Sequence, residues 1–163
     1  MEITTELVKE LRDLTGVSVM QCKKALEEAG GDIEKAKALL LEKSAEQAAK
    51  KSDRTLGAGF ISSYVHSTGT VGAMVELMCE TDFVAKNDEF KALARDIAMQ
   101  VSATNPTFLK AEEVTAGSEE QALLDQSFIK NPELTITNLL QSATQKFGEK
   151  IEVSRFVRFS VAQ

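Results

Sequence analysis

The segment Thr81-Asp82-Phe83-Val84-Ala85-Lys86-Asn87 lies where the sequence pattern changes from a strand to a helix. The apolar run Val71 to Cys79 before it is typical of a buried strand. Asp88 to Val101 after it repeats apolar residues at helical spacing. A large aromatic side chain beside a carboxylate at such a junction is placed to reach into another molecule. The segment therefore indicates a protein that acts on a partner.

Two further strands are predicted on either side of this segment. Residues Phe60 to His66 alternate with a period of two, and the turn Ser67-Thr68-Gly69-Thr70 joins them to Val71–Cys79 as an antiparallel hairpin. The run Ile151 to Phe159 predicts a third strand. Strict alternation would mix Arg155 with apolar residues on one face, so we expect a β-bulge to correct the mixture.

The rest of the second half is less regular. The helix from Asp88 is expected to stop at Thr104-Asn105-Pro106. Ser118 is a candidate cap for a short helix that runs to Gln126, and Asn131-Pro132 is a candidate turn. Thr135 to Phe147 predicts a further helix, with Gly148 just past its end.

Residues up to about 50 predict three short helices. The expected caps are Thr4 or Thr5, then Ser18 in a capping box with Gln21, then Asp32. The apolar positions of the three helices are, in order, Leu7, Val8, Leu11 and Leu14; Met20, Cys22, Ala25, Leu26 and Ala29; and Ile33, Ala36, Leu39 and Leu40. Ala45 to Lys51 can extend the third helix as a connector, and Gly57 and Gly59 mark a loop. We therefore expect domains at residues 1–51 and 52–163.

Composition excludes several classes of protein. The chain has 163 residues, 43% hydrophobic and 27% charged, with a net charge of −6. An acidic chain without clustered Lys and Arg is a poor nucleic-acid binder. No run is long enough to span a membrane, and Met1-Glu2-Ile3-Thr4 lacks the features of a signal peptide. We expect a cytoplasmic protein, with Cys22 and Cys79 as buried free thiols.

Catalytic and cofactor signatures are missing from the sequence. Cys22 and Cys79 have no evident base, they lack the spacing of metal ligands, and His66 has no adjacent nucleophile. The glycines form neither a dinucleotide-binding fingerprint nor a phosphate-binding loop. We expect no enzyme activity, no cofactor and no metal.

Three motifs, in order along the chain, resemble the bacterial translation elongation factor Ts family. The first runs from Leu11-Arg12 to Ala25-Leu26, and the second from Cys79 to Asn87. The third is Phe147-Gly148-Glu149-Lys150-Ile151 with Arg155-Phe156 after it. The resemblance implies an α+β fold: an N-terminal three-helix module of the ubiquitin-associated type, then a core with a three-stranded antiparallel sheet and flanking helices.

The resemblance also implies a function, which is guanine-nucleotide exchange on elongation factor Tu. In this mechanism Asp82 and Phe83 push between helices of the Tu nucleotide domain and disturb its magnesium site and phosphate-binding loop, so that GDP leaves. Longer family members carry two core subdomains. This chain has room for one, and residues 107–134 look shortened, so we expect a homodimer in which two half-cores form one platform.

The candidate partner contacts are Thr81, Asp82, Phe83, Val84, Arg12, Met20, Lys23 and His66. Residue patterns alone leave other roles open for them. Phe83 can be a core residue, Asp82 can cap the helix that follows, and His66 can be structural. Two other functions also stay open, a docking protein that uses only the helical bundle and a small enzyme that uses Cys79 or His66.

Overall fold

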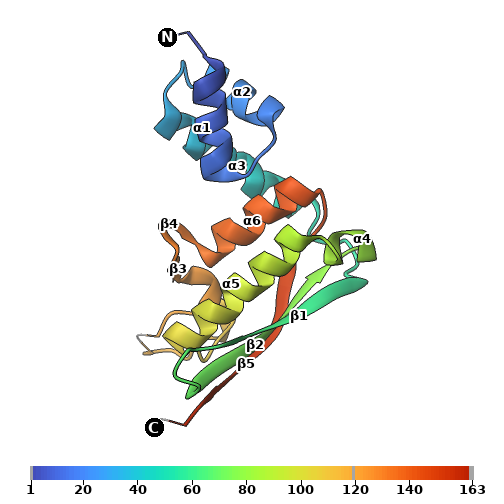
Figure 1. The fold of residues 1–163 in the computed structure, drawn as a ribbon, viewed down its shortest axis with the longest axis vertical. Coiled ribbons are helices and arrows are strands. Elements are labelled where there is room, and N and C mark those ends of the chain that lie inside the picture. Colours follow the sequence, from blue (N-terminus) through green and yellow to red (C-terminus); the bar gives the residue numbers. More distant parts are fainter. Residues whose placement is uncertain (1, 119, 162–163) are drawn as a thin grey trace. The chain divides into compact units, whose positions relative to one another are not determined.

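The computed structural model describes residues 2–118 and 120–161. The chain forms two compact units, one of Met1–Asp53 with Gln141–Glu149 and one of Arg54–Leu140 with Lys150–Gln163. The first is helical and the second contains a sheet with helices, so the expected α+β class is confirmed (Figure 1). Whether residues 1–51 and 52–163 are independent domains stays a prediction.

Three helices form the N-terminal part of the first unit. They are α1 (Thr5–Thr15), α2 (Val19–Glu28) and α3 (Ile33–Lys50). Each begins at an expected cap, whose side-chain oxygen accepts a hydrogen bond from a backbone N–H of the first turn; the caps are Thr4, Ser18 and Asp32. The expected extension of the third helix through the Ala-rich stretch is also confirmed.

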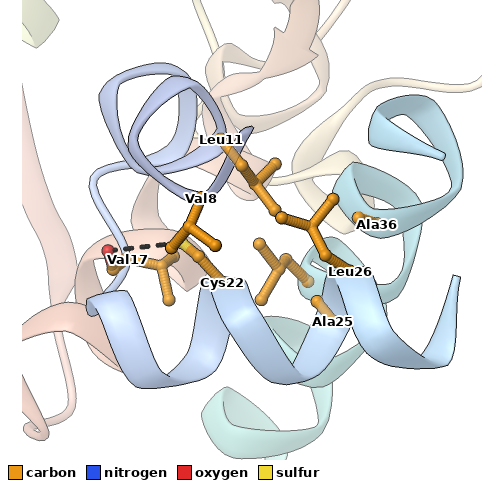
Figure 2. Packing of buried hydrophobic residues seen from close by; sticks show 8 residues of the cluster. Val8, Leu11, Val17, Cys22, Ala25, Leu26 and Ala36 are labelled. Atoms are coloured by element: carbon orange, nitrogen blue, oxygen red, sulfur yellow. Dashed lines mark hydrogen bonds between the residues drawn. The ribbon is translucent and has the colours of Figure 1, made fainter. Parts of the chain in front are cut away.

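Small and branched side chains fill the centre of this bundle (Figure 2). Cys22 lies among them, and its Sγ donates a hydrogen bond to the Val17 carbonyl oxygen at 3.5 Å. Leu14, expected on the core face with Leu11, is instead 53% exposed. A helix turns about 100° per residue, so Leu14 lies roughly 90° from the middle of the face that Val8 and Leu11 share.

The second unit is built on a three-stranded antiparallel sheet. Its order is β1 (Ala58–Val65), β2 (Val71–Cys79), β5 (Glu152–Ser160), with β2 in the centre. Helix α5 (Asp88–Thr104) lies along one face of the sheet (Figure 1). Fully buried side chains from both layers form this core, among them Val75, Leu77, Phe90, Ala94, Ile97 and Val101.

The expected bulge is present in β5. Glu76 pairs with Arg155, but its neighbour Leu77 pairs with Val153, so Ser154 is the extra residue. The bulge lets Val153 and Phe156 face the same side of the sheet although they are three residues apart. It therefore keeps Val153 and Phe156 on the inner face, where Arg158 also lies and donates from Nε to the Ser102 carbonyl of α5 at 3.0 Å.

Residues 107–134 differ from expectation. The predicted short helix from Ser118 to Gln126 is wrong: the only helical elements in the described part of residues 107–134 are two 3₁₀ turns, Ala111–Glu113 and Leu123–Asp125. A small hairpin follows, β3 (Ser127–Phe128) and β4 (Asn131–Thr135), which leads into α6 (Ile136–Phe147). The buried Gln100 amide fixes this hairpin, because it donates to the Ser127 carbonyl at 3.0 Å and accepts from the Ile129 N–H at 2.9 Å.

Candidate functional site

The segment after β2 forms a single helical turn, α4 (Asp82–Ala85), with Thr81 as its N-cap residue. The N–H of Ala85 donates to the Thr81 carbonyl at 3.2 Å, and that of Lys86 to the Asp82 carbonyl at 3.0 Å. Cys79, fully buried at the end of β2, fixes where the turn begins. The turn is therefore a short, hydrogen-bonded support at one end of the central strand (Figure 1).

Phe83 projects from this support into solvent. Its side chain is 90% exposed, the highest value among the large apolar residues that are exposed in the described chain. Thr81 and Asp82 are also exposed. The next residue, Val84, is only 6% exposed and packs into the core. The core interpretation of Phe83 is thus wrong, while Val84 anchors the turn that presents it.

Asp82 does not cap the helix that follows, contrary to one of the two roles considered for it. Asn87 is the N-cap of α5, and its Oδ1 accepts from the N–H groups of Glu89 at 2.8 Å and Phe90 at 3.4 Å. The Asp82 carboxylate instead stands in the first turn of α4, next to Phe83 and exposed. The carboxylate of Asp82 and the ring of Phe83 are therefore consecutive exposed side chains of the same turn.

The candidate contacts of the bundle lie at the end of α1 and the start of α2. Arg12, Met20 and Lys23 are all exposed, Met20 by 81%. Lys23 forms only a loose ion pair with Glu27, at 3.9 Å. Val19 is 52% exposed beside Met20, so two neighbouring apolar side chains stand in solvent there. The helical pattern had placed Met20 with the apolar positions of α2, and the structure corrects this.

Cys22 is the thiol closest in sequence to this surface, and it is unsuited to chemistry. Burial raises the pKa of the Cys22 thiol, against a smaller lowering by the Thr15 hydroxyl and the Arg12 charge. A neutral, buried thiol is a poor nucleophile. In the described residues, no group of three or more His, Cys, Asp or Glu side chains could hold a metal ion.

His66 lies far from Phe83 in the second unit. It follows β1 at the hairpin turn, where its N–H donates to the Val71 carbonyl at 2.9 Å and its Nδ1 is 3.1 Å from the Tyr64 hydroxyl. Phe83 follows the opposite end of β2. A strand extends about 3.3 Å per residue, so the hairpin is more than about 20 Å long. This length separates His66 from Phe83. The structure therefore does not bring His66 and Phe83 into one site.

A second exposed surface is the face of the sheet opposite α5. We call it the outer face, and it carries exposed apolar side chains from all three strands: Ile61, Val65, Met74, Val157 and Phe159. Phe159 is 73% exposed. Contiguous apolar patches of this kind mark interaction surfaces.

Among the helices of the described residues, none combines the length and the apolar composition that a membrane-spanning segment needs.

Comparisons with known proteins agree on one family. The family model described as Elongation factor TS matches residues 2–121. An Elongation factor Ts of Carboxydothermus hydrogenoformans is 42% identical, covering 99% of this chain and 90% of that protein. One of Thermodesulfovibrio yellowstonii is 43% identical, covering 100% and 98%. These alignments extend over 195 and 196 residues against 163 here, so the relatives contain residues that this chain lacks. The chain belongs to the elongation factor Ts family, which places it in translation elongation.

Proposed function

We propose that this chain is a guanine-nucleotide exchange factor that binds elongation factor Tu in the cytoplasm and accelerates GDP release. It acts as a binding protein and makes or breaks no chemical bond. The observation that carries the proposal is the 90% exposure of Phe83 on a turn that the buried Val84 and Cys79 hold in place. An aromatic side chain kept in water by a hydrogen-bonded support is suited to insertion into another protein.

Burial of the Phe83 ring in a partner contributes roughly 1.5–3 kcal/mol. Couplings between two binding sites are commonly of the same order, about 1–3 kcal/mol. The wedge alone thus supplies a useful part of the coupling, and a second contact surface adds to it. The exposed side chains of Arg12, Met20 and Lys23 are our candidates for that surface.

The mechanism is thermodynamic linkage. Insertion of Phe83 between helices of the Tu nucleotide domain, with the Asp82 carboxylate directed toward the magnesium site of Tu, favours the nucleotide-free conformation. An exchange protein binds nucleotide-free Tu more tightly than GDP-bound Tu by some ratio of affinities. By linkage, it weakens GDP binding to Tu by the same ratio. GTP then binds and the factor is released. The magnesium ion belongs to Tu, and the acidic factor needs no nucleic acid.

The test is the release of fluorescent GDP from elongation factor Tu. The chain should accelerate release, and Phe83→Ala should reduce the acceleration by about 10- to 100-fold, equivalent to the burial energy of the ring. Ile129→Ala serves as control, because Ile129 is also an exposed apolar residue of the second unit, at 46%. No acceleration by the parent chain contradicts the exchange function, and an unchanged rate with Phe83→Ala removes Phe83 from it.

We further propose that the factor works as a homodimer through the outer face. Two sheets pack face to face at about 10 Å and bury the side chains between them. The five exposed apolar residues of this face make such an arrangement favourable, and the dimer provides two copies of the Phe83 turn. Sedimentation equilibrium should show a dimer that Met74→Glu dissociates and Ile129→Glu leaves intact. A monomer at all concentrations contradicts this proposal.

A further inference from the structure

Glu80, between the end of β2 and Thr81, has a role that the exchange mechanism above does not use. Its carboxylate Oε2 accepts a hydrogen bond from the backbone N–H of Lys150 at 2.7 Å and pairs with Arg54 Nη1 at 3.3 Å. The Glu80 side chain is 19% exposed. Hydrogen bonds to an ionised carboxylate are stronger than those between neutral groups. Glu80 is therefore a firmly bonded residue directly before an exposed turn.

Both partners of Glu80 lie at special points of the chain. Arg54 and Lys150 are the first residues of the second unit at the two places where the chain enters it from the first. They are also bonded to each other, because Lys150 Nζ donates to the Arg54 carbonyl at 3.4 Å. The three residues form a closed network within the second unit. Glu80 thus connects the base of the Phe83 turn to two segments distant in sequence.

The turn has one anchor on each side of Phe83. After it, Val84 and Ala85 are buried at 6% and 7% exposure. Before it, the side chains of Thr81 and Asp82 are exposed, and the nearest residues with buried or mostly buried side chains are Cys79 and Glu80. We propose that Glu80 is a positioning residue for Phe83: its bonds to Lys150 and Arg54 hold the incoming strand end, so that the exposed ring keeps one direction. This inference rests on the proposed role of Phe83 in exchange.

A partner-free measurement tests the anchoring. The chain has no tryptophan, so Phe83→Trp creates a single tryptophan that can be excited selectively over Tyr64, and time-resolved anisotropy separates its local motion from overall tumbling. Glu80→Ala in this background should increase the amplitude of local motion. The matched control is Asp96→Ala, which removes a carboxylate of similar exposure, 28%, bonded to Lys130 at 2.7 Å elsewhere in the unit. Unchanged motion with Glu80→Ala, or an equal increase with Asp96→Ala, overturns the proposal.

A second variant covers the case in which Glu80→Ala does not fold. Arg54 is 48% exposed, so Arg54→Ala removes one partner of Glu80 with little risk to folding. Local motion should then rise above that of Asp96→Ala, because Glu80 loses its ion pair with Arg54. Motion equal to that of Asp96→Ala overturns the proposal.

Release of fluorescent GDP from elongation factor Tu gives the functional measurement, made with Phe83 in place. Glu80→Ala should reduce the acceleration about tenfold, which corresponds to the loss of a charge-assisted hydrogen bond, and Asp96→Ala should leave it unchanged. If the parent chain does not accelerate release, the exchange function fails while the anisotropy result still decides the anchoring. If the parent accelerates release and Glu80→Ala matches it, the positioning role fails.

Discussion

Phe83 and Phe90 are the same residue type seven positions apart, and the structure treats them in opposite ways. Phe90, in the first turn of α5, is fully buried against the sheet. Phe83, in the single turn α4, is 90% exposed. The difference lies in their neighbours. Phe90 begins a helical repeat with Ala94 and Ile97, whereas Val84 and Ala85 already occupy the buried positions of α4.

The comparison separates a residue that the fold needs from one that the fold only presents. Removal of a buried ring leaves a cavity that the surrounding side chains cannot fill. Removal of an exposed ring costs the fold little, so its cost appears in binding. Substitution of Phe90 should therefore reduce stability more than substitution of Phe83 does, whereas substitution of Phe83 should directly reduce nucleotide exchange.

The largest effect is expected for Phe90→Ala. Loss of a fully buried Phe side chain should lower the free energy of unfolding by about 3–5 kcal/mol, whereas Phe83→Ala should change it by less than about 0.5 kcal/mol. Denaturant unfolding followed by circular dichroism measures both. Similar losses for the two variants would show that Phe83 supports the core and would remove the distinction.

A smaller effect is expected at the residue that joins the two helices. Asn87→Ala removes the cap that bonds the N–H groups of Glu89 and Phe90, so the free energy of unfolding should fall by about 1 kcal/mol. Asn87→Ser keeps an acceptor and should lose less. Equal losses in the two variants would mean that the capping hydrogen bond is not what Asn87 contributes.

The smallest effect concerns a cap that carries charge, Asp32 of α3. Its hydrogen bond from the Lys35 N–H lowers the pKa of Asp32 below the usual value of 3.8. A carboxyl group whose pKa is lower in the folded than in the unfolded state contributes its full stabilisation at pH values above the unfolded-state pKa. This stabilisation is lost as the pH falls through the folded-state pKa. Asp32→Asn should therefore unfold at a lower temperature than the parent near neutral pH. The difference in unfolding temperature between Asp32→Asn and the parent should narrow below pH 3.8. A difference that does not change with pH would exclude a contribution from the lowered pKa of Asp32.

Local signals in the sequence were sufficient for the regular elements. The caps Thr4, Ser18 and Asp32 were predicted from side chains that hydrogen-bond their own helix, and the bulge in β5 from the position of Arg155 among apolar neighbours. These features depend on residues close together in the chain. The family was likewise visible in contiguous motifs, and the comparisons confirmed it.

Features that depend on distant partners were not predictable. The β3–β4 hairpin relies on Gln100, a helical residue 27 positions before Ser127, so the residues at 107–134 gave no signal for it. The exposure of Phe83 and Leu14 depends on which neighbouring side chains occupy the buried positions, and this is set by the tertiary packing. The sequence gives no indication of a role for Glu80, because its bonds to Arg54 and Lys150 join residues that are distant in the chain.

The pairing of β2 with β5 has a consequence for how the protein forms during synthesis. Glu76 and Arg155 are 79 residues apart, so one edge of the central strand stays open until the ribosome has released residues 152–160. Contacts of such long range slow folding, and an open apolar strand edge invites pairing with other chains. The nascent chain therefore passes through an interval in which the central strand, with its buried Val75 and Leu77, lacks β5 as a neighbour.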